Sequence, residues 1–318
     1  SRRCAVITIG TWNLENLFRP GNSAGPDSDA AYDDKLTALA KTIAGLAPEG
    51  LAVQEVGDPE ALDDLAGRLD GTWHTETADA DGRGIRVGVL SRLALSGAEQ
   101  VTAFPEVLRP VQVDDDGGTM TKMGRPALRV RVESGGTTLD LLSCHLKSKL
   151  LTFPGGRFSP DDENERARFA AYALNRRTAE AVTVRGYVTA LLRGDGQHRA
   201  VVVAGDLNDE PAAATTQILL GPSGSEIGTA GFPRPDRGDA NRLWNLAPLI
   251  PEAQRFSRIY NGRRELIDHL LVSHAVVHAV DSVVTGDIDV VSVTDQPSRI
   301  REEPGSDHRP VVVRVRLG

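Results

Sequence analysis

The sequence predicts an α/β protein that gathers its functional groups at one edge of a β-sheet. Short apolar segments such as residues 201–204 are typical of buried strands, and they alternate with segments in which leucine and alanine recur at helical spacing. A strand at 5–12, a helix at 36–46 and a strand at 51–55 form a strand–helix–strand unit, which leaves its two strands parallel. Open sheets of this kind bind ligands at the carboxyl ends of their strands, so we expect function there.

The composition is that of an ordinary globular protein. The 318 residues are 40% hydrophobic and 25% charged, and we expect one domain over residues 1–318. No apolar run approaches the roughly 20 residues of a membrane span, which predicts a soluble protein without a transmembrane segment, cytoplasmic or secreted. The formal net charge of −8 excludes a surface that binds polyanions as a whole, so a nucleic-acid substrate would require a local basic patch or a metal ion. Nothing in the sequence indicates a protein partner.

The remaining elements follow from turn signals and hydrophobic spacing. The turn at Ser134-Gly135-Gly136 makes residues 128–145 a hairpin, which places Arg125 and His145 together at its open end. The two cysteines, Cys4 and Cys144, lie at opposite ends of predicted strands, and we expect both thiols to be free. The other elements expected are a helix from Pro59, strands at 85–90 and 310–317, helices at 161–193 and 211–220, and hairpin arms at 256–260 and 266–272 around Asn261-Gly262.

Polar side chains stand at the ends of several predicted strands. They combine carboxylate and amide oxygens with imidazoles and contain no thiolate, a set that suits a hard divalent cation such as Mg²⁺ or Mn²⁺ better than zinc. A cation of this kind commonly binds a phosphate oxygen as well, which indicates metal-assisted hydrolysis at phosphorus. The residues are Asn13, Glu55, His145, Asp206 with Asn208, Asp268 with His269, and Asp307 with His308.

In chain order, six short motifs resemble those of the endonuclease/exonuclease/phosphatase superfamily. They are Trp12-Asn13-Leu14-Glu15-Asn16, Gln54-Glu55, Ser143-Cys144-His145-Leu146-Lys147-Ser148, Gly205-Asp206-Leu207-Asn208-Asp209, Ile267-Asp268-His269 and Ser306-Asp307-His308-Arg309-Pro310. Each motif is weak alone, but together and in this order they are specific. The resemblance implies a four-layer α/β/β/α sandwich of two packed mixed sheets, with the site at one edge between them.

The resemblance also implies roles for the matching residues. Asn13, Glu55 and Asp307 match metal-binding positions. Asp206 matches the group that orients or deprotonates the attacking water, and Asn208 matches one that holds the phosphate. Asp209 has no matching role, and we expect it to cap the following helix.

Two histidines match catalytic positions of the superfamily. His308 matches the histidine of the Ser-Asp-His motif, and Asp268 matches the carboxylate that fixes the orientation of that imidazole. His145 matches a second histidine, which is replaced in abasic-site enzymes, so its presence argues against a dedicated abasic-site endonuclease. Sequence alone leaves open which histidine serves as the acid.

A basic segment follows the predicted hairpin. It contains seven basic residues against four acidic ones, a balance of 7 − 4 = +3 in a chain of net charge −8. Lys147, Lys149 and Arg125 are the predicted substrate-binding residues, while much of the segment is equally well explained as a solvated helix face. The loop at 150–160 carries Phe153 and Phe158, which either pack under it or stack on a base. The seven basic residues are Lys147, Lys149, Arg157, Arg166, Arg168, Arg176 and Arg177.

We therefore predict a divalent-metal-dependent hydrolase of phosphate esters, most simply a phosphodiesterase that cleaves nucleic acid by in-line attack of water. The alternative enzyme is a phosphatase or sphingomyelinase-type hydrolase of a lipid or small-molecule phosphate ester. The alternative from another class is a catalytically silent binding module. The complete set of matched residues favours an enzyme, because a binding module has no need of the whole set.

Overall fold

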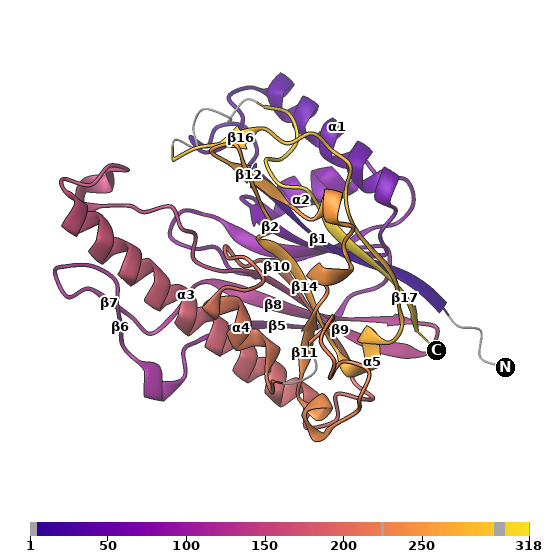
Figure 1. Ribbon diagram of the computed structural model, residues 1–318. Coiled ribbons are helices and arrows are strands. Elements are labelled where there is room, and N and C mark those ends of the chain that lie inside the picture. The colour runs from indigo at the N-terminus through magenta and orange to yellow at the C-terminus, as the bar shows by residue number, and fades with distance from the viewer. Residues whose placement is uncertain (1–4, 224–225, 296–302, 318) are drawn as a thin grey trace.

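The computed structural model describes residues 5–223, 226–295 and 303–317, and two six-stranded mixed sheets pack face to face within them (Figure 1). The first sheet has the order β15 (Val280–Thr285), β17 (Val311–Leu317), β1 (Ala5–Leu17), β2 (Gly50–Val56), β4 (Arg86–Ser91) and β3 (His74–Thr77). The second has the order β11 (Leu243–Asn245), β14 (Asp268–Ser273), β10 (Ala200–Asp206), β9 (Thr137–His145), β8 (Lys122–Ser134) and β5 (Ser96–Ala103). Smaller sheets are formed by β13 (Arg263–Glu265), β12 (Arg258–Tyr260) and β16 (Ser292–Val293), and by β6 (Val111–Gln112) and β7 (Thr119–Met120).

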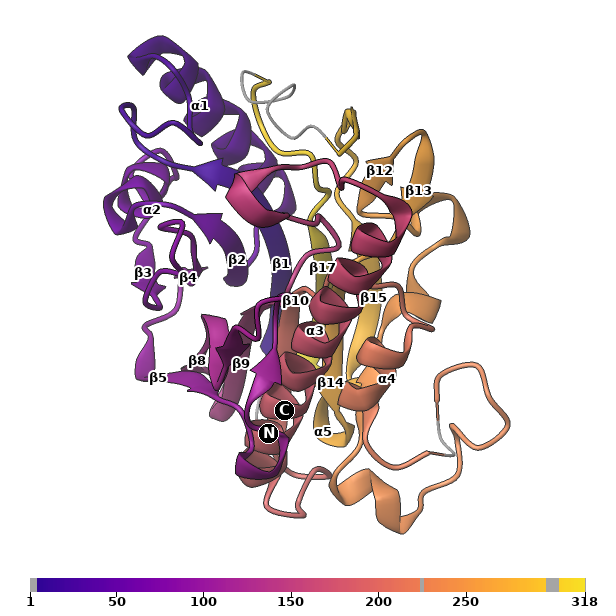
Figure 2. The same cartoon turned by 90° about the vertical axis from the view of Figure 1, so that its left-hand side faces the viewer.

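Three apolar layers hold the sheets and helices together. Successive side chains of a strand point to opposite faces, so Val202 and Ala204 of β10 pack between the sheets while Val201 and Val203 face outward. That outer face of the second sheet is covered by α3 (Glu163–Leu192) and α4 (Ala214–Leu220). The outer face of the first sheet is covered by α1 (Asp29–Leu46) and α2 (Pro59–Ala66), whereas α5 (His274–Val277) is a single turn after β14. Figure 2 shows these layers, which confirm the predicted four-layer α/β/β/α sandwich.

Strand pairing brings the predicted polar strand ends to one edge. β1 and β2 are parallel, with Asn13 opposite Gln54, and β9 and β10 are parallel, with His145 opposite Asp206. β14 runs antiparallel to β10, so Asp268 at its start lies opposite Asp206 at the end of β10. Gln54 also donates a hydrogen bond of 3.2 Å to the Ser143 hydroxyl, which links the two sheets beneath this edge.

Several elements differ from the sequence-based expectation. The helix predicted at 36–46 begins earlier, at Asp29, where the Ser28 side chain caps it by accepting from the backbone N–H of Ala31. The predicted hairpin arm at 266–272 is wrong: the arm is β13, and Asp268–Ser273 joins the second sheet instead because its fully buried side chains complete that core. The strands β3 and β5 were not predicted, since their mostly polar, partly exposed side chains give no apolar signal.

Cys144 is free, as predicted, and it is buried, while Cys4 lies outside the described residues. The sequence also predicts loops at 221–239 and 295–305, and residues 224–225 and 296–302 of these lie outside the described residues. Within the described ranges, no helix combines the length and the hydropathy that crossing a membrane requires.

Candidate active site

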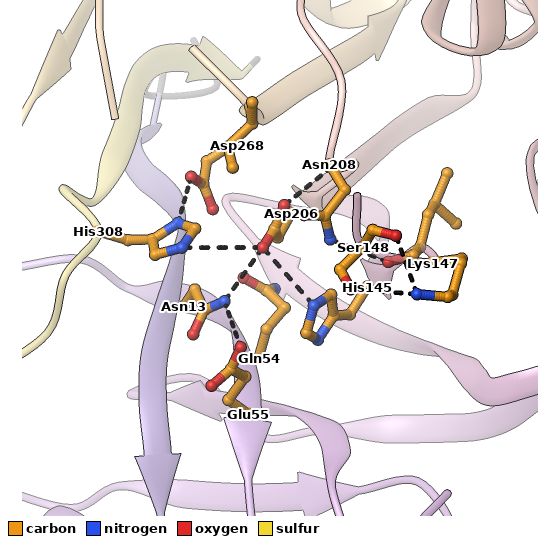
Figure 3. Close-up of polar contacts among 12 residues, drawn as sticks. Asn13, Gln54, Glu55, His145, Lys147, Ser148, Asp206, Asn208, Asp268 and His308 are labelled. Atoms are coloured by element: carbon orange, nitrogen blue, oxygen red, sulfur yellow. Dashed lines mark hydrogen bonds and ion pairs between the residues drawn. The ribbon is translucent and has the colours of Figure 1, made fainter. Parts of the chain in front are cut away.

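Asp206, the last residue of β10, is the centre of a buried polar cluster (Figure 3). Its Oδ1 accepts a hydrogen bond of 2.9 Å from the backbone N–H of Asn208, and its Oδ2 accepts one of 3.1 Å from the Asn13 amide. The Nε2 atoms of His145 and His308 lie 3.6 and 3.9 Å from the same Oδ2. Four residues that the sequence places on other strand ends, Asn13, His145, Asp268 and His308, therefore meet around this carboxylate.

The His308 imidazole is fixed by contacts on several sides. Its Nδ1 lies 2.7 Å from Oδ2 of Asp268, which is fully buried at the start of β14. The backbone carbonyl of His308 accepts from the Trp12 indole, and its N–H donates to the hydroxyl of Ser306, which in turn donates to the Asn13 carbonyl. Because Asp268 occupies Nδ1, the ring presents Nε2 toward Asp206.

The two histidines have opposite electrostatic environments. Burial and the neighbouring Arg125 guanidinium hold the pKa of His145 well below its usual range. Burial also lowers the pKa of His308, but the carboxylates of Asp268 and Asp307 outweigh it and raise that pKa to about 10. Burial and the Asp268 carboxylate raise the pKa of Asp206 to about 7. The site thus combines a neutral imidazole, an imidazolium and a carboxylate that can accept a proton near neutral pH.

A second acidic group adjoins this cluster and fits a divalent cation. Burial, with the carboxylates of Asp307 and Glu55, raises the pKa of Glu15 to about 8 against the opposing effect of Lys35, and burial and Glu55 raise the pKa of Asp307. Asn16 contributes a buried amide oxygen that has no hydrogen-bond partner among the described residues. Carboxylate and amide oxygens are the donors that Mg²⁺ and Mn²⁺ prefer. A bound cation also relieves the repulsion between the crowded carboxylates.

The predicted metal ligand Asn13 has an additional function in this arrangement. Its amide nitrogen donates to Glu55 at 3.1 Å and to Asp206, while its oxygen accepts from the backbone N–H of Glu15. Asn13 therefore bridges the two acidic groups. Glu55 and Asp307 supply the carboxylates on the metal side, and the assignment of all three residues as ligands stays a prediction.

Asp206, Asp268 and His308 also form a group with metal-ligating atoms within 4.8 Å of one another. In this group the His308 Nδ1 is already engaged by Asp268, and the positive charge of the imidazolium compensates the two carboxylates. The acidic group of Glu15, Glu55 and Asp307 has three carboxylates; Lys35 lies 3.4 Å from Glu15, and the His308 imidazole, which already compensates the first group, lies 3.9 Å from Asp307. The excess negative charge makes the second group the better match for a cation.

Backbone conformation at the strand ends also distinguishes the site. Glu15, Asn16, Glu55 and Asn208 all have positive φ, between 46° and 58°, a region that residues other than glycine seldom adopt. Such residues are retained where the surrounding structure demands them, and they concentrate at functional sites.

The model of the endonuclease/exonuclease/phosphatase family matches residues 10–308. The chain belongs to this family. The family's members are divalent-metal-dependent hydrolases of phosphate esters. No curated protein sequence matches the chain significantly.

Solved structures of the family have the same fold. A zebrafish (D. rerio) TDP2 humanised by 14 mutations is 16% identical, with a TM-score of 0.57 over 97% of this chain and 98% of that one. The human Nocturnin catalytic domain is 14% identical, with a TM-score of 0.57 over 97% and 93%. A mannosyl-6-phosphatase from Bacteroides thetaiotaomicron is 16% identical, with a TM-score of 0.57 over 96% and 98%. At these identities the likeness concerns the fold alone.

The three predicted substrate-binding residues occupy different positions around the site. Arg125 meets His145 as predicted: its guanidinium donates to the backbone carbonyls of His145 and Leu146 and pairs with Asp81 at 3.0 Å. The Lys147 ammonium donates to the carbonyl oxygens of Ser148 and Leu150 in its own loop, and Figure 3 shows it beside Ser148. Lys149 borders the catalytic cavity, which has a volume of about 260 Å³. The role of all three in substrate binding stays a prediction.

Two smaller sequence-based expectations have clear outcomes. Asp209 does not cap α4; its carboxylate instead pairs with Arg177 and Lys149, both at 3.0 Å. Phe153 is buried and packs on Phe169, with ring centroids 5.2 Å apart, so it is a packing residue rather than an exposed stacking surface.

Sequence reasoning missed other residues that border the cavity. Arg258 and Tyr260 of β12, Arg263 of β13 and Arg83 of the β3–β4 connection come from short or polar segments without a recognisable motif. Glu15 lies in the motif at residues 12–16, but the sequence predicted no functional role for it. Its crowding with other carboxylates makes it part of the acidic group. Only the tertiary contacts identify these residues.

Proposed function

We propose that this chain is a divalent-metal-dependent phosphodiesterase that cleaves nucleic acid by in-line attack of water. The observation that carries the proposal is the presence of cationic side chains on both sides of the catalytic cluster. Arg83 borders the cavity from the β3–β4 connection, and Arg258 and Arg263 border it from β12 and β13. In Figure 2, β3 and β4 lie on one side of β1 and β10, and β12 and β13 lie on the other. A phosphodiester extends in two directions from the scissile phosphorus, so a substrate chain would meet positive charge along both.

The residues of the cluster have geometries that suit this reaction. Asp206 is the water activator, because it is a buried carboxylate that can accept a proton near neutral pH. His308, oriented through Nδ1 by Asp268, presents Nε2 as a charged donor to the phosphate, and His145 is a second donor for the leaving oxygen. Asn208 holds the phosphate.

Glu55 and Asp307, with Asn13, would hold the cation. When bound there, Mg²⁺ or Mn²⁺ supplies positive charge for the phosphate oxygens. The protein's own part is to keep the Glu55 carboxylate close to Asp206, because the Asn13 amide donates a hydrogen bond to each of them.

The proposal is tested with one panel of substrates and one metal-loaded preparation. The panel contains supercoiled plasmid, a single-stranded oligonucleotide, bis(4-nitrophenyl) phosphate and 4-nitrophenyl phosphate, each with Mg²⁺, with Mn²⁺ and with excess chelator. We expect chelator-sensitive cleavage of the nucleic acids and of the diester, which His308→Ala abolishes. Turnover of the monoester together with intact nucleic acids would instead establish a phosphatase, and no turnover of any substrate would indicate a binding module.

A further inference from the structure

A second cavity lies directly beside the catalytic one. Its volume is about 290 Å³, and it shares Arg83, Arg125 and Ser148 with the catalytic cavity. Beyond these shared residues it extends toward α3, where Lys147 and Arg176 border it. A substrate held at Asp206 could therefore continue past Arg125 into this second cavity.

The border of the second cavity carries excess positive charge. Arg125 pairs with Asp81 at 3.0 Å and Arg176 pairs with Glu180 at 3.1 Å, whereas no carboxylate among the described residues pairs with Arg83 or Lys147. Arg83, Arg125 and Arg176 against these two acids leave 3 − 2 = +1 even without Lys147, in a chain whose net charge is −8. Burial and the cations Arg176 and Arg125 lower the pKa of Lys147 to about 7, which is a further sign of a positive potential.

Arg176 has room to reach a ligand. Its Nε donates to Glu180, which leaves its other guanidinium nitrogens for other contacts. Gly124 lies against this guanidinium, and a Cβ atom added there would overlap Arg176 Nη2. The absence of a side chain at position 124 therefore keeps the guanidinium at the cavity border.

Apolar side chains also border the cavity. Val113, Met120 and Leu151 border it, together with Phe169 and Tyr172 of α3, whose rings contact each other with centroids 5.6 Å apart. A ligand that fits must combine an anionic group with a flat or apolar one. A nucleotide has that combination in its phosphate and its base.

We propose that this second cavity is a subsite for the nucleotide adjacent to the scissile phosphate, with its own phosphate bound by Arg83 and Arg176. This inference rests on the proposed nucleic-acid cleavage and specifies how the substrate chain leaves the catalytic centre. Lys147, one of the predicted substrate-binding residues, borders this second cavity and not the catalytic one. Arg125 lies between the two cavities and holds the backbone of residues 145–146 in place.

The first test uses protein variants and compares a long and a short substrate for each of them. The measured quantity is the ratio of kcat/KM for a single-stranded oligonucleotide to kcat/KM for bis(4-nitrophenyl) phosphate, which is too short to enter the subsite. Loss of one charged hydrogen bond predicts a fall of about tenfold in this ratio for Arg176→Ala and for Arg83→Ala. The slope of log kcat/KM against log salt for the oligonucleotide should become shallower by about 0.7 in each. Arg83 is exposed, so Arg83→Ala keeps the test valid if removal of the Glu180 partner unfolds Arg176→Ala.

Arg166→Ala is the matched control. Arg166 lies on the same helix, pairs with Glu163 and borders neither cavity, so its removal changes net charge equally and should leave the ratio unchanged.

The substrate side of the test uses the unaltered protein. Two oligonucleotides with the same preferred cleavage position are compared. One carries an uncharged methylphosphonate at the phosphate on the 5′ side of that position, and the other carries it on the 3′ side. We expect about a tenfold loss of kcat/KM at one flank, and no further loss at that flank in Arg176→Ala. Ratios within twofold of wild type in both arginine variants, or equal tolerance of both methylphosphonates, would overturn the subsite alone. Failure of the wild-type protein to cleave any nucleic acid while it hydrolyses the diester would overturn the proposed function and the subsite together.

Discussion

Gly205 offers the sharpest test of how the fold positions the active site. It precedes Asp206 on β10, opposite Cys144 of the parallel strand β9. A Cβ atom added at Gly205 would lie 2.8 Å from the Cys144 carbonyl carbon and closer still to its oxygen, where ordinary contacts begin at 3.4 Å. These are backbone atoms of a buried strand, which cannot rotate away as a side chain would, so Gly205→Ala forces β9 and β10 apart.

The expected loss of stability in Gly205→Ala follows from the separation of β9 and β10. Overpacking in a core costs about 1–3 kcal/mol, and one lost ladder hydrogen bond adds about 1 kcal/mol, so we expect the free energy of unfolding to fall by about 2–4 kcal/mol. The same shift separates His145 from Asp206, now 3.6 Å apart. A displacement of about 1 Å at a catalytic centre costs about a hundredfold in rate.

Two assays measure the effects of Gly205→Ala. Urea unfolding gives the change in stability, and hydrolysis of bis(4-nitrophenyl) phosphate under conditions where the variant is folded gives the change in kcat. Gly186→Ala is the control, because Gly186 is exposed within α3 and an added Cβ atom there meets nothing within 4 Å. That variant should be more stable by about 0.5–1 kcal/mol with unchanged activity. If Gly205→Ala matches wild type in both assays, the close approach does not constrain the site.

Three further predictions address the metal group, the imidazolium and the buried thiol. Saturating Mg²⁺ or Mn²⁺ should raise the Tm of the wild-type protein by relieving carboxylate repulsion, and Glu55→Gln should lose most of that increase; equal increases in both proteins would refute the metal assignment. Asp268→Asn removes the carboxylate that holds the His308 imidazole, so kcat should fall by about 10²–10⁴-fold, and a change below threefold would contradict the role of Asp268. Burial raises the pKa of Cys144 to about 12, above its usual value of 9.0, so the stability from this protonated thiol is complete below pH 9 and declines between pH 9 and 12. In a Cys4→Ser background, Cys144 should resist a thiol reagent at pH 8 until the protein unfolds, and rapid labelling of the folded protein would contradict its burial.

The motifs are local in sequence, which is why so much of the site could be predicted without a structure. Four motifs lie toward the carboxyl end of an apolar strand and two lie at or before the start of one. Parallel pairing of β1 with β2 and of β9 with β10, and antiparallel pairing of β14 with β10, therefore bring them to one edge. The continuous apolar run of β10 likewise predicts a strand buried on both faces, which a sandwich with helices outside requires.

The prediction of the hairpin around Asn261-Gly262 shows where sequence signals stop. The turn is where the sequence puts it, but β13 is three residues long and β14 joins a different sheet. A hydrophobic pattern predicts that a strand is buried but not which strand it pairs with, because its apolar side chains can be buried in either sheet.

What the sequence determined by itself is the family's fold, the strand ends that carry its chemistry and the kind of donor atoms they offer. Tertiary structure alone decided which charges compensate one another: it gave His308 two carboxylate neighbours and His145 a cationic one, and it turned Lys147 from the catalytic cavity toward the second. The physical reason is that a pKa or an ion pair depends on distances and burial between residues remote in sequence, and those are set only when the two sheets pack.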